Sequence, residues 1–260
     1  MDTLELKRRL RELSMGVVEY HNSIGSTNDR AAELYNQGAP HFSLVVADEQ
    51  TEGRGRSGRS WFTPPGAALA FSLVLRPDGL QDEAVLRCTG LGALAVCQSI
   101  QDIYTIPAMI KWPNDVLLSR KKVCGILVES EVKEGAAAYA VIGIGLNVNL
   151  SFSGHPEIEA IATSLSAELG RDVPTAELVR ILLTEMERLY VVLPAGEAIY
   201  AAWRDSLVTL GKEVSVESGG ATQVGIAQSV DRDGSLLLRL PDGSLSRIVA
   251  GEVTLRHQTE

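Results

Sequence analysis

Hydrophobic and polar residues alternate along the first hundred positions in blocks that predict both helices and buried strands. A helix is expected at Asp29–Asn36, because the Ser-Thr-Asn sequence before it supplies N-cap side chains and a glycine follows it. Apolar runs at Phe42–Ala47 and Leu69–Leu75 predict two buried strands. Ala84–Ile100 is apolar all round, which is typical of a buried helix. Charges mixed among leucines at the N-terminus predict an amphipathic helix there.

The middle of the chain predicts a run of strands followed by a run of helices. The strand-like segments are Met109–Trp112, Val116–Leu118, Val123–Glu131 and Ala138–Val148, with turns at Pro113-Asn114-Asp115, Arg120-Lys121 and Glu134-Gly135. Turns this short imply that consecutive strands pair in an antiparallel manner. The expected helices are Pro156–Leu169, ended by Gly170, then Thr175–Leu193, ended by Pro194-Ala195-Gly196, and Glu197–Leu207. Because strands and helices come in separate runs, the predicted fold class is α+β.

Beyond Gly211 the pattern changes to short strands separated by glycine turns. The strands are expected at Glu213–Val216, Val224–Val230, Leu236–Leu240 and Leu245–Ala250. This pattern predicts a small, barrel-like β domain. We place the boundary near Leu210, so that residues 1–210 and 211–260 form two domains.

Composition limits the class of protein. A chain of 260 residues, 45% hydrophobic and 22% charged, is ordinary for a globular protein. Its longest apolar runs fall short of the roughly 18 residues that span a bilayer, and its N-terminus lacks the apolar core of a secretory signal. Cys88, Cys97 and Cys124 are odd in number and never spaced as CxxC, which argues against a disulfide framework or a zinc site. We therefore expect a cytoplasmic protein without a membrane segment.

The net charge is −9, which argues against broad nucleic-acid binding because neutralising phosphates needs a wide basic surface. Any anion site must then be local. The four histidines are scattered along the sequence and form no metal-binding pattern.

A basic, glycine-rich segment at Gly53–Trp61 reads GRGRSGRSW and lies between the two predicted strands. Its three glycines let the backbone approach a ligand, and Arg54, Arg56 and Arg59 offer bidentate contacts to phosphate or carboxylate. The alternative is a solvated basic loop, which is the commoner fate of an Arg/Gly segment. The interleaving of arginines and glycines between buried strands favours an anion site.

This segment also differs by one residue from the P-loop pattern of nucleotide kinases, since Arg59 replaces the lysine before serine. A P-loop leads directly into a helix, whereas Pro64 and Pro65 follow here and oppose helix propagation. The kinase interpretation is therefore set aside. Gly143-Ile144-Gly145 lacks the third glycine of a dinucleotide fingerprint, and we interpret it as close backbone packing.

The segment Lys111-Trp112-Pro113-Asn114-Asp115 places a cation, a ring, an amide and a carboxylate at a strand end, where polar side chains often serve a site. A simple Pro-Asn-Asp turn with incidental neighbours explains it equally well. Lys122 is a second candidate cation, and a solvated turn lysine is its ordinary alternative.

Taken in order, these motifs resemble those of the biotin protein ligases. The succession is GRGRSGRSW, then KWPNDV at 111–116, KKVCGILVE at 121–129, IGIGLNVN at 142–149 and a late GEV at 251–253. The resemblance runs from about Ser26 to Val253. It implies a mixed or antiparallel sheet flanked by helices, similar to class II synthetases, with a small SH3-like C-terminal domain.

The resemblance implies a two-step reaction. Biotin and ATP with Mg²⁺ would form biotinyl-5′-AMP, and the biotinyl group would pass to a lysine on the biotin carboxyl carrier domain of acetyl-CoA carboxylase or a related enzyme. The biotin carboxylate is already ionised near neutral pH, so the first step needs no general base. It needs positive charge and Mg²⁺ at the phosphates instead. No tightly held protein metal is expected.

The resemblance also implies a role for individual residues. Lys122 and Arg56 would be catalytic. Biotin would contact Ser26, Thr27, Asn28, Gln50, Gly53, Arg54, Gly55, Arg56, Lys122 and Gly125. ATP would contact Arg56, Arg59, Trp61, Lys111, Asn114 and Asn147. Asp115 would either help hold the metal or orient the acceptor lysine, and the loop at 53–61 would order over the adenylate.

Three questions stay open at this point. Family members that repress transcription carry an N-terminal winged helix-turn-helix, and the roughly twenty residues before Tyr20 are too few for one, so we expect no operator binding.

A lipoate or octanoate ligase of the same fold and a non-catalytic biotin or nucleotide sensor are the alternative functions. A homodimer is one possible assembly.

Overall fold

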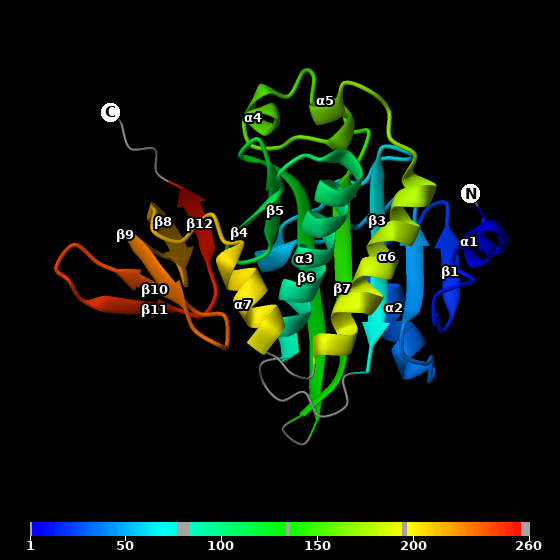
Figure 1. Ribbon diagram of the computed structural model, residues 1–260, viewed down its shortest axis with the longest axis horizontal. Helices are drawn as coiled ribbons and strands as arrows, with labels where there is room; N and C mark the ends of the chain where they lie inside the picture. Colours follow the sequence, from blue (N-terminus) through cyan, green and yellow to red (C-terminus); the bar gives the residue numbers. More distant parts are fainter. Residues whose placement is uncertain (1, 77–83, 134–135, 194–196, 256–260) are drawn as a thin grey trace.

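The computed structural model describes residues 2–76, 84–133, 136–193 and 197–255, and its strands form two separate sheets (Figure 1). The expected turn at 134–135 and the expected break at 194–196 lie outside the described residues. The helices are α1 (Thr3–Arg9), α2 (Thr27–Asn36), η1 (Arg56–Gly58), α3 (Ala84–Tyr104), α4 (Pro156–Glu159), α5 (Leu165–Leu169), α6 (Thr175–Val192) and α7 (Glu197–Asp205).

The larger sheet has seven strands in the order β1-β2-β3-β7-β6-β5-β4. They are β1 (Val18–His21), β2 (Ser43–Ala47), β3 (Ala68–Leu75), β4 (Met109–Lys111), β5 (Asp115–Leu118), β6 (Lys121–Lys133) and β7 (Ala136–Asn147). Among the described strands of this sheet, β1 and β2 form the one parallel pair, so the sheet is mixed and the predicted α+β class is confirmed. The sequence did not reveal β1, because a run of four residues is too short to show a clear strand pattern.

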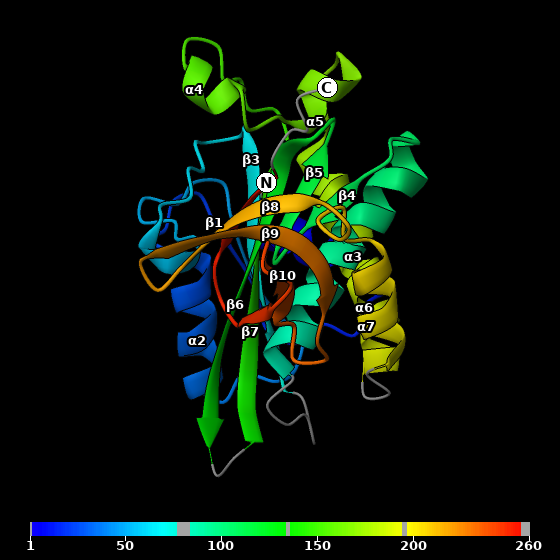
Figure 2. The same cartoon turned by 90° about the vertical axis from the view of Figure 1, so that its left-hand side faces the viewer.

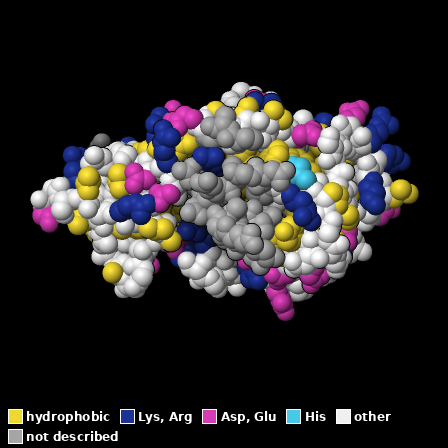
Figure 3. Space-filling model, turned by 90° about the horizontal axis from the view of Figure 1, so that it is seen from below, with side chains coloured by type: hydrophobic (Ala, Val, Ile, Leu, Met, Phe, Trp, Pro, Cys, Tyr) yellow, Lys and Arg dark blue, Asp and Glu magenta, His cyan; other side chains and the backbone are white. Residues whose placement is uncertain are grey.

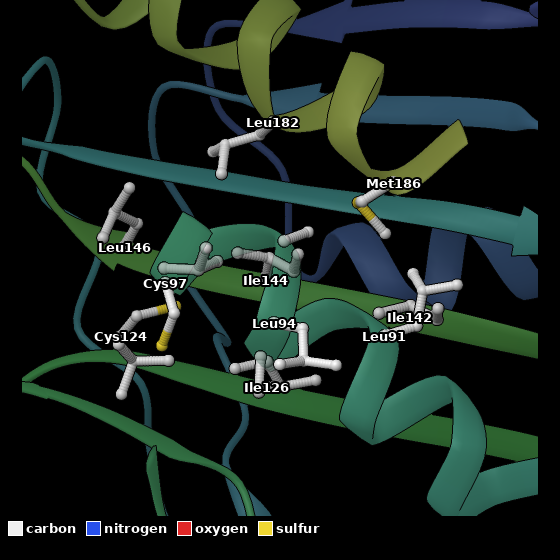
Figure 4. Close-up of a cluster of buried hydrophobic side chains, with 14 of the residues drawn as sticks. Leu91, Leu94, Cys97, Cys124, Ile126, Ile142, Ile144, Leu146, Leu182 and Met186 are labelled. Carbon is white, nitrogen blue, oxygen red and sulfur yellow. The ribbon is translucent and has the colours of Figure 1, made fainter. Parts of the chain in front are cut away.

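Helices cover both faces of this sheet, as Figure 2 shows with the strands nearly edge-on. On one face α2 packs its Ala31 and Leu34 against Val45, Val74 and Val141. On the other face, α3 lies against the strands and α6 lies against α3 (Figure 4). Leu91 and Leu94 of α3 meet the isoleucines of β6 and β7 there, and Leu182 and Met186 of α6 close the layer. The main apolar core therefore occupies this second face.

The predicted helix at Pro156–Leu169 is wrong, because the chain forms two short helices, α4 and α5, with an extended link between them. The link pairs with the start of β6: the Lys122 N–H donates to Ile161 O at 2.8 Å, and the Thr163 N–H donates to Lys122 O at 2.9 Å. These bonds need extended backbone, which a continuous helix cannot supply. Ser164 then starts α5, its Oγ accepting from the Ala167 N–H.

The second sheet contains β8 (Glu213–Ser218), β9 (Ala221–Val230), β10 (Leu236–Arg239), β11 (Leu245–Ile248) and β12 (Glu252–Leu255). All pairs among these strands are antiparallel, in the order β11-β10-β9-β8-β12, so β12, the last strand of this sheet, lies beside β8, its first. The predicted β domain is present. The boundary near Leu210 falls between α7 and β8 and stays a prediction.

Trp112 joins the two sheets. Its side chain is fully buried, its indole Nε1 donates to Gly234 O at 2.8 Å, and its backbone N–H donates to Thr209 Oγ1 at 2.9 Å. The ring in the KWPND segment therefore serves mainly as an anchor between the two parts of the chain. It fixes the turn that carries Asn114 and Asp115.

No helix among the described residues is both long and apolar enough to cross a bilayer. Figure 3 shows one face of the molecule, on which acidic and basic side chains are interspersed. This mixture on the visible described surface accords with a chain that has 24 basic and 33 acidic residues.

Close packing of α3 on the sheet gives a first prediction. A Cβ at Gly92 would lie 3.2 Å from Cγ2 of Ile126 and 3.3 Å from Cγ2 of Ile142. We expect Gly92→Leu to lower the free energy of unfolding by about 1–3 kcal/mol, because the added side chain forces α3 away from the strands. Urea denaturation followed by circular dichroism measures it. Gln101→Leu, at an exposed position of the same helix, is the control, and equal stability of the two variants would contradict the prediction.

Candidate active site

A cleft opens on the sheet face that α2 covers, where the glycine-rich loop approaches the C-terminal sheet. It holds about 910 Å³ of empty space, counting the part open to solvent, which is the size of a small-molecule site. Most of the predicted site residues line it. They are Ser26, Thr27, Asn28, Gln50, Arg54, Gly55, Arg56, Arg59, Trp61, Lys111, Asn114, Asp115, Lys122 and Gly125.

A β-bulge in β6 brings Lys122 to the cleft. Gly125 pairs with Asp115, but the register then shifts, so that Lys122 pairs with Leu117 and Val123 is the extra residue. Strict alternation from Gly125 would have turned Val123 toward the cleft and Lys122 toward the core. The bulge reverses this, leaving Val123 fully buried and Lys122 in the cleft wall.

Lys122 and Lys111 share one carboxylate. Lys122 Nζ lies 2.6 Å from Asp115 Oδ1, and Lys111 Nζ lies 3.4 Å from Oδ2 of the same residue. The Asp115 side chain is only 12% exposed, so these pairs are little screened by solvent. The cleft therefore presents two ammonium groups at defined positions around one buried negative charge.

Arg56 adds a third cation to this end of the cleft. Its Nη1 lies 3.4 Å from Asn114 Oδ1, and Asn114 is itself held by its Nδ2, which donates to Ile126 O at 2.6 Å. Burial lowers the pKa of the Arg56 guanidinium, and the Asp115 carboxylate opposes that shift. An arginine nevertheless stays charged at neutral pH. Three cations against one carboxylate make this end suited to an anion such as a polyphosphate.

Trp61 lies on a floor made of glycines. Gly125 and Gly145 are register partners on β6 and β7, and a Cβ at Gly145 would lie 2.3 Å from the indole Nε1. The Lys122 ammonium is 5.2 Å from the centre of the indole, within range of a cation–π interaction. The Trp61 Nε1 is buried and makes no hydrogen bond within the described structure. Its predicted contact with adenine stays a prediction.

At the other end of the cleft, the start of α2 carries a set of buried polar side chains. Gln50 Oε1 accepts from both the N–H and the hydroxyl of Thr27, at 2.8 and 3.0 Å. Ser72, on β3, lies 2.8 Å from Thr27 Oγ1 and donates to Asn28 Oδ1 at 2.6 Å. Ser26, the N-cap of α2, places Thr27 and Asn28 here.

The interpretation of Gly143 and Gly145 as close packing is confirmed. A Cβ at Gly143 would lie 2.1 Å from Asn28 Oδ1, so the amide lies directly on the backbone of β7. Any side chain at either position would push Asn28 or Trp61 out of place.

Two predicted site residues lie outside the lining. Gly53 is buried beside it, with room for no Cβ because Trp61 O would be 2.3 Å away. Asn147 is buried, and its Nδ2 donates to Thr163 O at 3.0 Å, so its amide holds the link between α4 and α5. The structure does not bring its side chain to the cleft, and its role in ATP binding stays a prediction.

The structure also shows partners to which the sequence gave no role, although Glu129 and Glu252 fall within the KKVCGILVE and GEV motifs. Ser72 and Glu129 contact Asn28, and Glu252 of β12 forms an ion pair with Arg59 of the loop. Ser72 stands among apolar strand residues, and that isolation is the signal that could have marked it; Glu129 is followed by Ser130 and Glu131 and has no such signal. Nothing local in the sequence links Arg59 to a residue 193 positions later.

Comparison with known proteins fits this geometry. A family model described as "Biotin/lipoate A/B protein ligase family" matches residues 20–147, and "Biotin protein ligase C terminal domain" matches residues 209–256. The "Bifunctional ligase/repressor BirA" of Bacillus subtilis is 36% identical over 91% of this chain and 73% of its own length. The chain belongs to the biotin protein ligase family.

Other biotin protein ligases agree with this assignment. The "Biotin--[acetyl-CoA-carboxylase] ligase" of Paracoccus denitrificans is 35% identical over 84% of this chain and 92% of its own. The biotin protein ligase from Aquifex aeolicus, solved in complex with biotin and ATP, superposes with a TM-score of 0.77 at 27% identity, covering 93% of this chain and 99% of that one. The predicted family resemblance is confirmed.

The glycine floor of this ligase gives a second prediction. We expect Gly145→Ala to displace the Trp61 indole, because its Cβ would lie 2.3 Å from Nε1 and 2.4 Å from Cε2. In a ¹H–¹⁵N NMR spectrum, the indole N–H signal of Trp61 should move while those of Trp112 and Trp203 stay. Gly25→Ala, with 3.6 Å to its nearest neighbour, is the control. An unchanged Trp61 signal in Gly145→Ala would contradict the prediction, because it would show that a Cβ at position 145 fits beneath the indole without displacing it.

Proposed function

We propose that this biotin protein ligase forms biotinyl-5′-adenylate from biotin and ATP in the cleft and then passes the biotinyl group to a lysine of a carrier domain. One observation carries the proposal. A buried hydrogen-bonding set at Gln50, Thr27 and Asn28 and a cationic set at Lys122, Lys111 and Arg56 face a single cleft. The first suits a neutral polar ring and the second suits phosphates.

The biotin head group is a ureido ring with two N–H donors and one carbonyl acceptor. Thr27 offers a hydroxyl and Gln50 an amide nitrogen, so together they provide an acceptor and a donor. The Gly125–Gly145 floor would give the ring a flat surface, and Trp61 would then have to shift from its present place on that floor. The acid end of biotin would reach Lys122.

In the first step a carboxylate oxygen of biotin attacks the α-phosphorus of ATP, the bond to the β-phosphate oxygen breaks, and pyrophosphate leaves. No proton moves, because the carboxylate is already ionised. Lys122 and Arg56 stabilise the charge that spreads over the phosphorus oxygens. Asp115 orients Lys122 through their 2.6 Å pair, so we assign it a positioning role in this step.

In the second step the uncharged amine of the acceptor lysine attacks the biotinyl carbonyl carbon, the bond from that carbon to the phosphate oxygen breaks so that AMP leaves, and the proton of the amine passes to solvent. We keep Asp115 as a candidate for orienting that amine, since it is the carboxylate in the cationic set. The names of relatives from Paracoccus denitrificans and Mycobacterium tuberculosis point to the biotin carrier of acetyl-CoA carboxylase as the acceptor.

Magnesium would enter with ATP. Both oxygens of Asp115 already lie near lysine nitrogens, and among the described residues no three His, Cys, Asp or Glu side chains converge on a metal position. The cleft thus fits an ion carried on the phosphates, which the side-chain oxygens of Asn114 and Asp115 would help to hold. Such an ion would neutralise charge on the leaving pyrophosphate.

Pyrophosphate exchange into ATP tests the acid specificity. We expect exchange with biotin and background exchange with lipoate, octanoate or no acid. Exchange that is as fast with lipoate or octanoate would favour the acyl-carrier ligase of the same fold. Biotin binding without any exchange would favour a sensor that transfers nothing.

The cationic set gives a matched variant test. We expect Lys122→Met to slow biotin-dependent exchange by about 100-fold or more, the size of effect seen when one charge-stabilising donor is removed from an active site. Its melting temperature should stay close to that of the wild type. Lys212→Met removes an exposed lysine and should leave the rate unchanged. Equal rates of biotin-dependent exchange in Lys122→Met and Lys212→Met would show that Lys122 has no role in catalysis.

A further inference from the structure

Glu129 ends the KKVCGILVE motif and stands beside the cleft, but neither the roles implied by the resemblance nor the proposed mechanism use it. It lies on β6 two residues after Leu127 and four after Gly125, so all three residues face the same side of the sheet. Its Oε2 accepts from Asn28 Nδ2 at 2.6 Å, and both of its oxygens lie 3.0 Å from Arg54 Nη2. One carboxylate thus contacts the buried polar set and the glycine-rich loop together.

We propose that Glu129 is a positioning residue for biotin recognition, because its carboxylate fixes which way round the Asn28 amide lies. This inference rests on the proposed biotin site at Thr27, Asn28 and Gln50.

The argument starts from what each group is able to donate. An ionised carboxylate only accepts hydrogen bonds, so Glu129 requires the NH₂ side of Asn28. The carbonyl side of Asn28 must then face Ser72, which lies 2.6 Å away and has a single hydroxyl proton to give. Burial leaves Asn28 only this orientation or a half-turn that exchanges its oxygen and its NH₂, since it is 5% exposed and lies directly on Gly143.

The consequence reaches Thr27. Ser72 Oγ is 2.8 Å from Thr27 Oγ1 but has already spent its proton on Asn28. The Thr27 hydroxyl then receives no proton from Ser72 and donates within the protein, either to Ser72 Oγ at 2.8 Å or to Gln50 Oε1 at 3.0 Å. With either acceptor, Thr27 Oγ1 keeps a lone pair for a ligand N–H, so the direction of the hydrogen bonds from Asn28 to Thr27 is set by Glu129.

Without that carboxylate the Asn28 Nδ2 keeps, among the described residues, only its long 3.4 Å hydrogen bond to Leu127 O, which is too weak to prevent a half-turn of the amide that presents its NH₂ to Ser72. Ser72 would then donate to Thr27 and occupy the lone pair that a ureido N–H needs. The pocket would keep its shape, but Thr27 would no longer offer an acceptor to the N–H groups of biotin. Arg54 would keep its other partner, Asp29 Oδ1 at 2.7 Å, so the loop retains one anchor.

Three variants test the proposal by isothermal titration with biotin. Glu129→Leu, which has no acceptor, should weaken biotin binding at least 10-fold. Glu129→Gln keeps a carbonyl acceptor for Asn28 and should stay within about 3-fold of the wild type, although it loses the charge opposite Arg54. Glu177→Leu is the control: it removes a surface glutamate paired with Arg180 and should not change affinity. The KM for ATP should stay constant in all three.

Near wild-type biotin affinity in Glu129→Leu would overturn the inference. Equal weakening in Glu129→Leu and Glu129→Gln would also overturn it, by showing that the charge on Arg54 matters and the orientation of Asn28 does not. If Glu129→Leu fails to fold, Glu129→Met, an unbranched side chain of similar length that has no oxygen acceptor, takes its place and should weaken biotin binding at least 10-fold. A wild-type protein that binds no biotin would refute the proposed function itself.

Discussion

The active site depends on one extra residue in β6. The bulge at Val123 lets a strand that is apolar toward the core present Lys122 to the cleft, where Asp115 from the neighbouring strand meets it at 2.6 Å. Asp115 in turn is placed by the turn that Trp112 anchors to Gly234. The cationic end of the cleft is therefore a product of strand register and of one buried indole, and its precision comes from rigid sheet backbone.

One face of the larger sheet packs the apolar core, and the opposite face forms the active site. The face under α3 and α6 is closely packed with leucine and isoleucine, and the opposite face has glycines where ligands and polar side chains must approach the backbone. Gly125, Gly143 and Gly145 sit on strands whose other face belongs to the core. The enzyme can thus expose a flat backbone surface without loosening the packing that holds β6 and β7.

The sequence predicted most strands, most helices and the family, because long apolar runs and ordered motifs are strong signals. It did not predict β1, whose four residues are too short a run to show a clear strand pattern, or the break in the expected helix at Pro156–Leu169, which follows from pairing with Lys122. It gave a role to Asn28 but none to Ser72 or Glu129, since the partners of a buried amide are set by strand register. Local patterns carry no information about contacts between residues far apart in the chain.

The pair between Arg59 and Glu252 has a consequence for how the protein is made. Glu252 belongs to the last strand and lines the same cleft as the loop at 53–61, which is translated about two hundred residues earlier. A chain that still lacks β12 therefore lacks the partner of Arg59 and one wall of the cleft. The lining of the cleft is complete only after the last strand of the C-terminal sheet has been made and has folded.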